Sequence, residues 1–477
     1  MSAQTATARP RARPRWRGRE ARLLILVALI LAIGWVGLAS TQAGRPTIGD
    51  ARALFVLLIM LVLVHLALTV DGRRRDQVLL PVVGLLMGLS VLLMSRLPQD
   101  LVVQRVGSIE LSLVSLQLLW IGLSLGIAAL IAVGLRNDLL LRSYKYTWAV
   151  AGIVLLLLVF VFGDETNGAR LTLRLGPFAG QPSELLKIIL VVFLAAYLAD
   201  NRALLAGRDS RLGPIRLPPL LYLLPMVVMW GLALATVVVQ RDLGAALLFY
   251  SVFLVLLYVA TQRRDLLVIG VALFLAGGAV LVAFFPHVQE RVQIWLDPFA
   301  TAQGAGFQIV RGLYALGRGG VLGTGLGAGL PGVGGAPSIP AVHTDFVFAA
   351  LGEELGLAGG LAILILYAIF AERGLRIAAG ARDEFRTLLA AGLTLVIVVQ
   401  AAIIVAGNAK LIPLTGITLP WIAYGGSSML AGGVVLGLLL AVAVEDRPGT
   451  PSEPMGWRDR IVDGSRAVAG RVERVVR

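Results

Sequence analysis

Residues 53–70 read ALFVLLIMLVLVHLALTV, an uninterrupted apolar run without a single charged side chain. An α-helix rises ~1.5 Å per residue, so a run of this length comes close to spanning the ~30 Å hydrocarbon core of a bilayer. The backbone of such a segment satisfies its polar groups in lipid only within a helix or a closed barrel. Because the apolar residues do not alternate with polar ones, the run predicts a membrane-spanning helix.

Runs of the same kind recur along most of the chain and predict an all-α, polytopic membrane protein. Only 15% of the residues are charged, whereas a soluble protein carries about 25%. We predict twelve spans, at 23–40, 53–70, 78–95, 112–134, 147–162, 184–200, 219–238, 243–260, 266–285, 346–371, 387–407 and 428–444. The first is long and lacks a convincing small-residue cleavage site, so we expect a span and not a removed signal peptide.

The arginines and lysines predict the orientation of these spans. The net charge is +14, and most basic residues fall in the N-terminal tail, in every second loop and in the C-terminal tail. The positive-inside rule makes these segments cytoplasmic, with both termini inside. We interpret the charge as a topology signal and an attraction to anionic membrane lipids, and we expect no nucleic-acid partner.

The remaining loops are then predicted to lie outside, and three of them are notable: 163–183, 286–345 and 408–427. The second is the longest and the richest in glycine. Loops longer than about 15 residues are usually functional or disordered. The chemistry of this protein is therefore expected on the outer side, near the loop 286–345.

Composition excludes several kinds of site. The chain has no cysteine, which rules out disulfides, cysteine-ligated zinc, iron–sulfur clusters and thiol nucleophiles. Its three histidines, His65, His287 and His343, are far apart in sequence. The glycine-rich loop lacks the G-x-x-x-x-G-K-[ST] motif, so nucleotide binding is weakly supported and an ATP-driven pump is not expected.

Asp345 stands where the long loop meets an apolar run. The plain interpretation is that Thr344 or Asp345 caps the helix that follows. A carboxylate at a helix N-terminus is also kept ionised by the helix dipole. At the membrane surface it is a candidate general base or ligand of a divalent ion.

A second polar cluster opens the predicted span at 184–200. Gln181 and Pro182 precede it, and Glu184 and Lys187 are three residues apart, so they share one face of the helix. Charged residues at the edge of a span are costly and usually face a cavity. A structural ion pair is the simpler alternative.

Other polar residues are also candidates. Asp242 lies between two predicted spans, in what is otherwise read as an ordinary polar turn. Glu353 and Glu354 lie about two turns into the tenth span, where adjacent carboxylates are not expected to face lipid. Lys410 follows the eleventh span and begins a polar outer segment.

These motifs, in this order, resemble those of the SEDS family, whose members include FtsW, RodA and SpoVE. Five separated motifs carry the resemblance: Gly168-Ala169-Arg170 with Leu175-Gly176, Gln181 to Lys187, Gln240 to Gly244, Arg291 through Asp345 to Glu354, and Pro413 to Ser428. The resemblance covers about 78–445 and so implies a ten-helix core with two additional spans at 23–70. The tails at 1–22 and 446–477 complete the predicted organisation. Leu171 and Thr172 depart from the family pattern, which commonly has a basic residue and then Trp at these positions.

The resemblance implies a peptidoglycan glycosyltransferase of the bacterial cytoplasmic membrane. It would polymerise lipid II on the outer face, release undecaprenyl pyrophosphate and work with a class B penicillin-binding transpeptidase. By the same resemblance, Asp345 is the catalytic residue, as general base or as a ligand of Mg²⁺ or Mn²⁺. The expected substrate-binding residues are Gln181, Glu184, Lys187, Arg170, Arg174, Asp242 and Lys410. Of these, Lys187, Arg170 and Arg174 are candidates to face the pyrophosphate, because such a leaving group needs positive charge.

Two other functions stay open on the sequence. A transporter or flippase of lipid-linked precursors suits twelve spans with charged residues inside them. The absence of a clear two-half repeat and the acidic residue at the end of a long outer loop argue against it. A non-catalytic scaffold for cell-wall assembly is the third reading, and the retained Asp345, Glu184 and Lys187 argue against that one.

Overall fold

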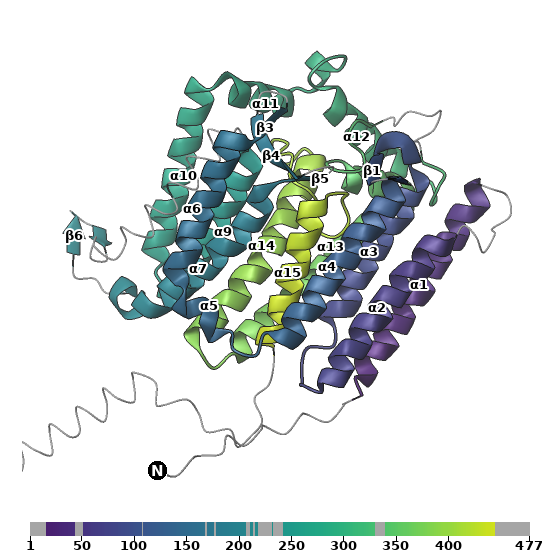
Figure 1. Cartoon of the computed structure of the whole chain (residues 1–477). Helices are drawn as coiled ribbons and strands as arrows, with labels where there is room; N and C mark the ends of the chain where they lie inside the picture. The colour runs from purple at the N-terminus through teal and green to yellow at the C-terminus, as the bar shows by residue number, and fades with distance from the viewer. Residues whose placement is uncertain are drawn as a thin grey trace, which may run out of the picture. The chain divides into compact units, whose positions relative to one another are not determined.

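The computed structural model describes residues 16–42, 51–106, 108–166, 169–175, 178–206, 210–212, 215–217, 231, 242–329 and 339–443. This part of the chain is mainly helical, and its long helices run side by side (Figure 1). Both predicted tails lie mostly or wholly outside the described residues, as does the predicted seventh span at 219–238.

In the described part, ten helices are long and apolar enough to cross a membrane. They are α1 (Gly18–Gln42), α2 (Arg52–Asp71), α3 (Leu79–Arg96), α4 (Leu113–Gly134), α6 (Lys145–Phe162), α7 (Pro182–Ala206), α9 (Leu243–Thr261), α10 (Arg264–Phe284), α13 (Val347–Gly380) and α14 (Glu384–Asn408). A shorter apolar helix, α15 (Gly426–Val442), matches the last predicted span. The prediction of a helical, multi-pass membrane protein is thus confirmed.

The polar connections gather at two ends of the bundle. At one end, which we call the loop end, lie the hairpin β1 (Gln104–Val106) and β2 (Ile109–Leu111), and the antiparallel strands β3 (Asp164–Thr166), β4 (Ala169–Leu175) and β5 (Phe178–Gly180) (Figure 1). The same end carries α11 (Pro286–Leu296) and α12 (Phe307–Gly319). The opposite end, the basic end, carries α5 (Leu139–Ser143) and the short hairpin β6 (Ser210–Leu212) and β7 (Ile215–Leu217). The long loop 286–345 is therefore partly helical.

Close packing of small residues joins α4 and α15. A Cβ on Gly433 would lie 2.7 Å from Ser124 Oγ, and one on Gly437 would lie 2.9 Å from the carbonyl oxygen of Ala128. Helices in lipid associate through such close backbone approaches, because lipid tails provide no hydrophobic drive between them. The glycines of α15 therefore determine how near it lies to α4.

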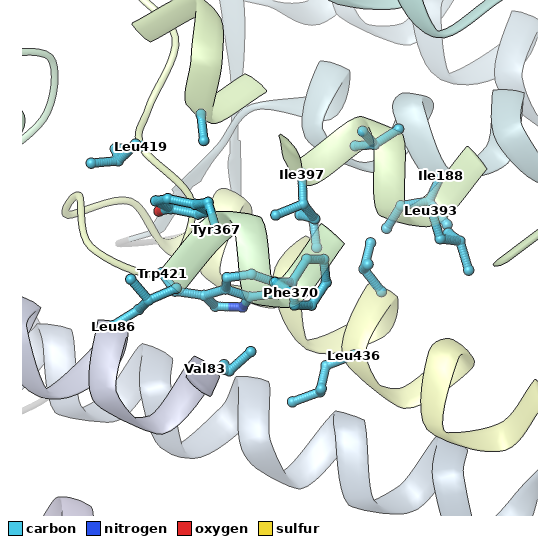
Figure 2. Close-up of a cluster of buried hydrophobic side chains, with 14 of the residues drawn as sticks. Val83, Leu86, Ile188, Tyr367, Phe370, Leu393, Ile397, Leu419, Trp421 and Leu436 are labelled. Carbon is cyan, nitrogen blue, oxygen red and sulfur yellow. The ribbon is translucent and has the colours of Figure 1, made fainter. Parts of the chain in front are cut away.

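The interior is filled by side chains from many helices around Trp421, which is 1% exposed. Figure 2 shows this indole beside Phe370 of α13, with Leu86 of α3 and Leu436 of α15 nearby. The Trp421 and Phe370 rings meet edge to face, with centroids 5.0 Å apart. Such aromatic pairs add about 0.5–1.5 kcal/mol beyond the area that they bury. The polar segment after α14 is thereby anchored in the bundle.

The two N-terminal helices pack on the core through α3 and α4. Leu31 of α1 and Leu61 of α2 fill the spaces beside Gly88 and Gly84 of α3. Near the basic end, His65 Nδ1 lies 2.6 Å from the carboxylate of Glu20, which is fully buried. The single histidine in the apolar run 53–70 thus joins α2 to α1.

The basic end is rich in ion pairs between neighbouring helices. Arg386 of α14 binds Asp138 through two hydrogen bonds of 2.7 Å. Arg373 of α13 pairs with Asp76, next to α3. The arginines that predict topology are thus also used to tie helix ends together.

Candidate active site

Asp345 lies at the entrance to α13, in a tight turn. Ala341 adopts φ +49°, and its carbonyl oxygen accepts hydrogen bonds from the N–H groups of Thr344, Asp345 and Phe346 at 3.1, 3.0 and 3.3 Å. The expectation that Thr344 or Asp345 caps the helix is wrong, because the N-cap residue of α13 is Phe346, which makes no side-chain cap hydrogen bond. The carboxylate is left available for another role.

The missing cap comes from Asn408, the last residue of α14. Its Oδ1 accepts from Ala349 N at 3.2 Å, and its Nδ2 donates to Asp345 O at 2.9 Å. Asn408 is 1% exposed. The sequence does not single out Asn408, since nothing local shows that it meets a residue 63 positions earlier.

Burial dominates the electrostatics of Asp345. The surrounding protein raises the pKa of its carboxyl from 3.8 to about 6, while Thr344 and the charge of Arg291 oppose this rise. The side chain still keeps partial exposure. A carboxylate with a pKa near neutrality exchanges protons readily at physiological pH, as a general base must.

Glu184 and Lys187 form a buried ion pair in the first turns of α7. Lys187 Nζ also donates to Gln400 Oε1 of α14 at 2.7 Å, and Gln400 Nε2 donates to Thr418 O at 2.8 Å. Gln400 is a site residue that sequence reasoning missed. The available signal was a glutamine in the middle of the apolar run 387–407.

Asp242 caps α9, with its Oδ1 accepting from Ala245 N at 2.9 Å. Its other oxygen accepts from Gln181 Nε2 at 3.3 Å, so it is more than a turn residue. Burial raises the pKa of Asp242, and the charge of Glu184 raises it further, whereas Arg291 lowers it. The structure thus brings Gln181, Glu184, Lys187 and Asp242 into one neighbourhood.

Arg291 connects this neighbourhood to Asp345, because its positive charge acts on Asp345 and on Asp242 alike. It projects from α11, and its Nη1 lies 3.5 Å from the carbonyl oxygens of Leu414 and Thr415. The sequence places Arg291 in a motif but not in the site. Only the packing of α11 over 410–415 shows its position.

Lys410 lies beside α11, and its polar contacts are with α11 and not with Asp345 or Asp242. Its Nζ donates to Leu296 O at 3.3 Å, and its carbonyl oxygen accepts from Trp295 Nε1 at 3.1 Å. Arg170 and Arg174 belong to β4, but their side chains lie outside the described residues.

The glycine-rich segment after α12 inserts into a break in α13. At this break Gly356 has φ +68°, and the N–H groups of Thr324 and Gly325 donate to the carbonyls of Glu353 and Glu354 at 3.0 Å. In return, Leu357 N donates to Gly320 O at 2.9 Å. These N–H groups are thus used within the fold and do not form a phosphate cradle.

Glu353 and Glu354 are each 1% exposed and are neutralised by arginines from other elements. Arg318 of α12 lies 3.2 Å from Glu353, and Arg96 of α3 lies 3.1 Å from Glu354. Arg96 also donates to Gly329 O at 2.6 Å. The prediction that these carboxylates avoid lipid is confirmed, and their role is to hold the inserted segment.

Comparison with known proteins gives the arrangement its context. Residues 76–448 match the family model of FtsW, RodA and SpoVE, which is described as "Cell cycle protein". Peptidoglycan glycosyltransferase RodA of Mycobacterium tuberculosis is 43% identical over 382 residues, which are 80% of each chain. Stage V sporulation protein E of Bacillus subtilis is 34% identical over 304 residues, 63% of this chain and 79% of that one.

Two solved structures share the fold. The crystal structure of the rod shape determining protein RodA from Thermus thermophilus covers 78% of this chain and 98% of its own, with 27% identity and a TM-score of 0.54. A chain from a peptidoglycan synthase complex, described as coordinating polymerization and crosslinking, covers 89% of this chain and 97% of its own, with 26% identity and a TM-score of 0.57.

Proposed function

This chain belongs to the FtsW, RodA and SpoVE family, and from this premise we infer that it is a peptidoglycan glycosyltransferase that polymerises lipid II into glycan strands. The observation that carries the assignment to this site is the placement of Asp345. Its carboxyl is partly buried at the loop end, burial raises its pKa to about 6, and Asn408 holds its backbone.

We assign Asp345 the role of general base. The 4-hydroxyl oxygen of the acceptor sugar attacks the anomeric carbon of the lipid-linked donor, and its proton passes to Asp345. The bond from that carbon to the pyrophosphate oxygen breaks, and the electron pair leaves with the polyprenyl pyrophosphate. General-base catalysis of this kind contributes about 10²–10⁴-fold in rate.

The proposed site has a second group of polar residues besides Asp345: Gln181, Glu184, Lys187 and Asp242. Because Lys187 is bound by Glu184 and Gln400, its charge is fixed in place. A fixed charge stabilises a developing negative charge without reorganising during the reaction. Arg170 and Arg174 remain proposed substrate ligands on β4.

We propose that a divalent cation would enter this site as part of the substrate complex. The described residues contain no group of three or more acidic or histidine side chains that could hold a metal. Mg²⁺, however, is usually held by one or two carboxylates together with substrate phosphates. Asp345 would be the ligand from this chain for Mg²⁺ or Mn²⁺, and the ion would offset the charge of the pyrophosphate.

The proposed site lies at the loop end, so the orientation of the bundle determines on which side of the membrane the reaction takes place. We propose that the loop end faces outward from the bacterial cytoplasmic membrane, where the positive-inside rule places it. A partner of the class B penicillin-binding transpeptidase type is supported by the likeness to the peptidoglycan synthase complex. That partner would crosslink the strands that this chain polymerises.

The test is polymer formation from purified lipid II by the reconstituted full-length protein. We expect glycan from the native protein and a loss of about 10²-fold or more with Asp345→Ala. Asp100→Ala, an exposed carboxylate in the 3₁₀ turn Gln99–Leu101, is the matched control. Normal glycan from a folded Asp345→Ala protein would remove the general-base role. Lipid scrambling without polymer would favour a flippase.

A further inference from the structure

Arg291 is half-buried and makes few hydrogen bonds within the described structure. It lies on the inner face of α11, one turn before Trp295 and three residues after the buried Val288. Its Nη1 donates to the carbonyl oxygens of Leu414 and Thr415, each at the long distance of 3.5 Å. Among the described residues, its Nε and Nη2 have no hydrogen-bond partner. A guanidinium has five N–H donors, so most of this donor capacity is open.

The other described cationic side chains at the loop end are already committed. Each has its own partner: Lys187 has Glu184, Arg96 has Glu354, Arg318 has Glu353, Lys410 has the Leu296 carbonyl, and Arg311 lies over the Phe307 ring. Arg311, Arg318 and Lys410 also keep unused N–H donors. Arg291 differs from them in that its charge acts on both Asp345 and Asp242.

The position of Arg291 is equally specific. Its charge acts on both Asp345 and Asp242, yet it forms an ion pair with neither of them in the described structure. The segment that it contacts also touches α9, because a Cβ on Gly244 would lie 2.8 Å from Thr415 O. Arg291 thus lies near both the proposed base and the capped start of α9.

We propose that Arg291 is the residue of this chain that binds the pyrophosphate of the lipid-linked donor. The inference rests on the proposed glycosyl transfer and gives its leaving group a specific partner. A planar guanidinium binds phosphate oxygens through two parallel hydrogen bonds, which a lysine does not do. Lys187, which the sequence suggested for this role, already donates to Glu184 and Gln400, so in this proposal it acts through its charge and Arg291 is the direct ligand.

Binding of inorganic pyrophosphate to the purified full-length protein in Mg²⁺ buffer tests the proposal without requiring turnover. We expect Arg291→Gln to weaken binding about tenfold or more, as loss of a charge-assisted pair of hydrogen bonds predicts. Arg291→Lys should be intermediate, because it keeps the charge and loses the fork. Arg311→Gln on α12 removes an exposed arginine of the same region and should bind like the native protein.

The outcomes separate this inference from the proposed function. Equal binding by the native protein and Arg291→Gln would overturn the inference, even if polymerisation of lipid II is normal. Equal weakening by Arg291→Gln and Arg311→Gln would also overturn it, because it would show a general charge effect. If the native protein makes no glycan but binds pyrophosphate through Arg291, the proposed function fails and the anion site stands. Should Arg291→Gln not fold, Arg291→Lys decides: unchanged affinity contradicts the proposal.

Discussion

Asn408 donates a 2.9 Å hydrogen bond from its Nδ2 to the backbone carbonyl of Asp345, and its Oδ1 accepts from Ala349 N. One buried amide at the end of α14 therefore fixes the start of α13 and the backbone of the proposed base. This contact joins two elements that the chain separates by 63 positions.

The first prediction concerns this amide. Asn408→Leu keeps the approximate volume but leaves the Ala349 N–H and the Asp345 carbonyl without their partner, which costs about 1–3 kcal/mol per buried group. We expect a lower thermal midpoint and a polymerisation rate reduced about tenfold or more, since misplacement of ~1 Å can cost 10²-fold. Asn201→Leu removes a 2.9 Å bond to Tyr197 O on α7 and should leave the rate unchanged. Equal rate losses in both variants would contradict the positioning role.

The second prediction separates structural and functional readings of the Glu184–Lys187 pair. Lys187→Met leaves Glu184 as an uncompensated buried charge, which costs about 3–5 kcal/mol. The double variant Glu184→Gln with Lys187→Met removes both charges and should recover most of the stability. If the pair serves the substrate, the stable double variant stays inactive. Recovery of polymerisation together with stability would show that the pair is only structural.

The third prediction concerns the break in α13. Gly356 has φ +68°, and a Cβ there would lie 2.6 Å from Val321 O. Gly356→Ala should therefore destabilise the inserted segment, through a positive-φ, extended conformation that only glycine adopts readily (about 1–3 kcal/mol) and through the clash with backbone atoms. Gly360→Ala is the control, because its Cβ would meet Phe348 at an ordinary 3.4 Å in a helical backbone. Protease nicking after α12 should rise in the first variant alone.

The fourth prediction is a pair of opposite pH trends. Burial raises the pKa of Asp345 from 3.8 to about 6, and a base must be ionised, so polymerisation should fall by half near pH 6 on acidification. The native fold holds this proton more tightly than the unfolded chain. Its contribution to stability is therefore present below pH 3.8 and lost as the pH rises through about 6. The difference in thermal midpoint between the native protein and Asp345→Asn should change over this range.

A flat difference between the two proteins from pH 4 to pH 8 would show that the pKa of Asp345 is not raised. Added Mg²⁺ provides a further comparison. If Asp345 is a ligand of the cation when substrate is bound, the acid limb should move to lower pH with added Mg²⁺, because a cation favours the ionised carboxylate.

The sequence by itself determined the class of the fold and singled out most residues of the proposed site. Uninterrupted apolar runs such as 53–70 have one stable form in lipid, since every backbone polar group must be satisfied within the segment. The residues of the proposed site also stand in local motifs, and Asp345 and the Glu184–Lys187 spacing are legible without coordinates.

The tertiary structure decided which of these residues meet. Asn408, Gln400 and Arg291 reach the site from elements far apart in the chain, and a hydrogen bond across 63 or 213 positions leaves no periodic signal in the sequence. The capping of α13 could not be predicted for the same reason: the expected local cap was replaced by a side chain from α14. Local spacing determines which face a residue occupies, but only packing determines what that face touches.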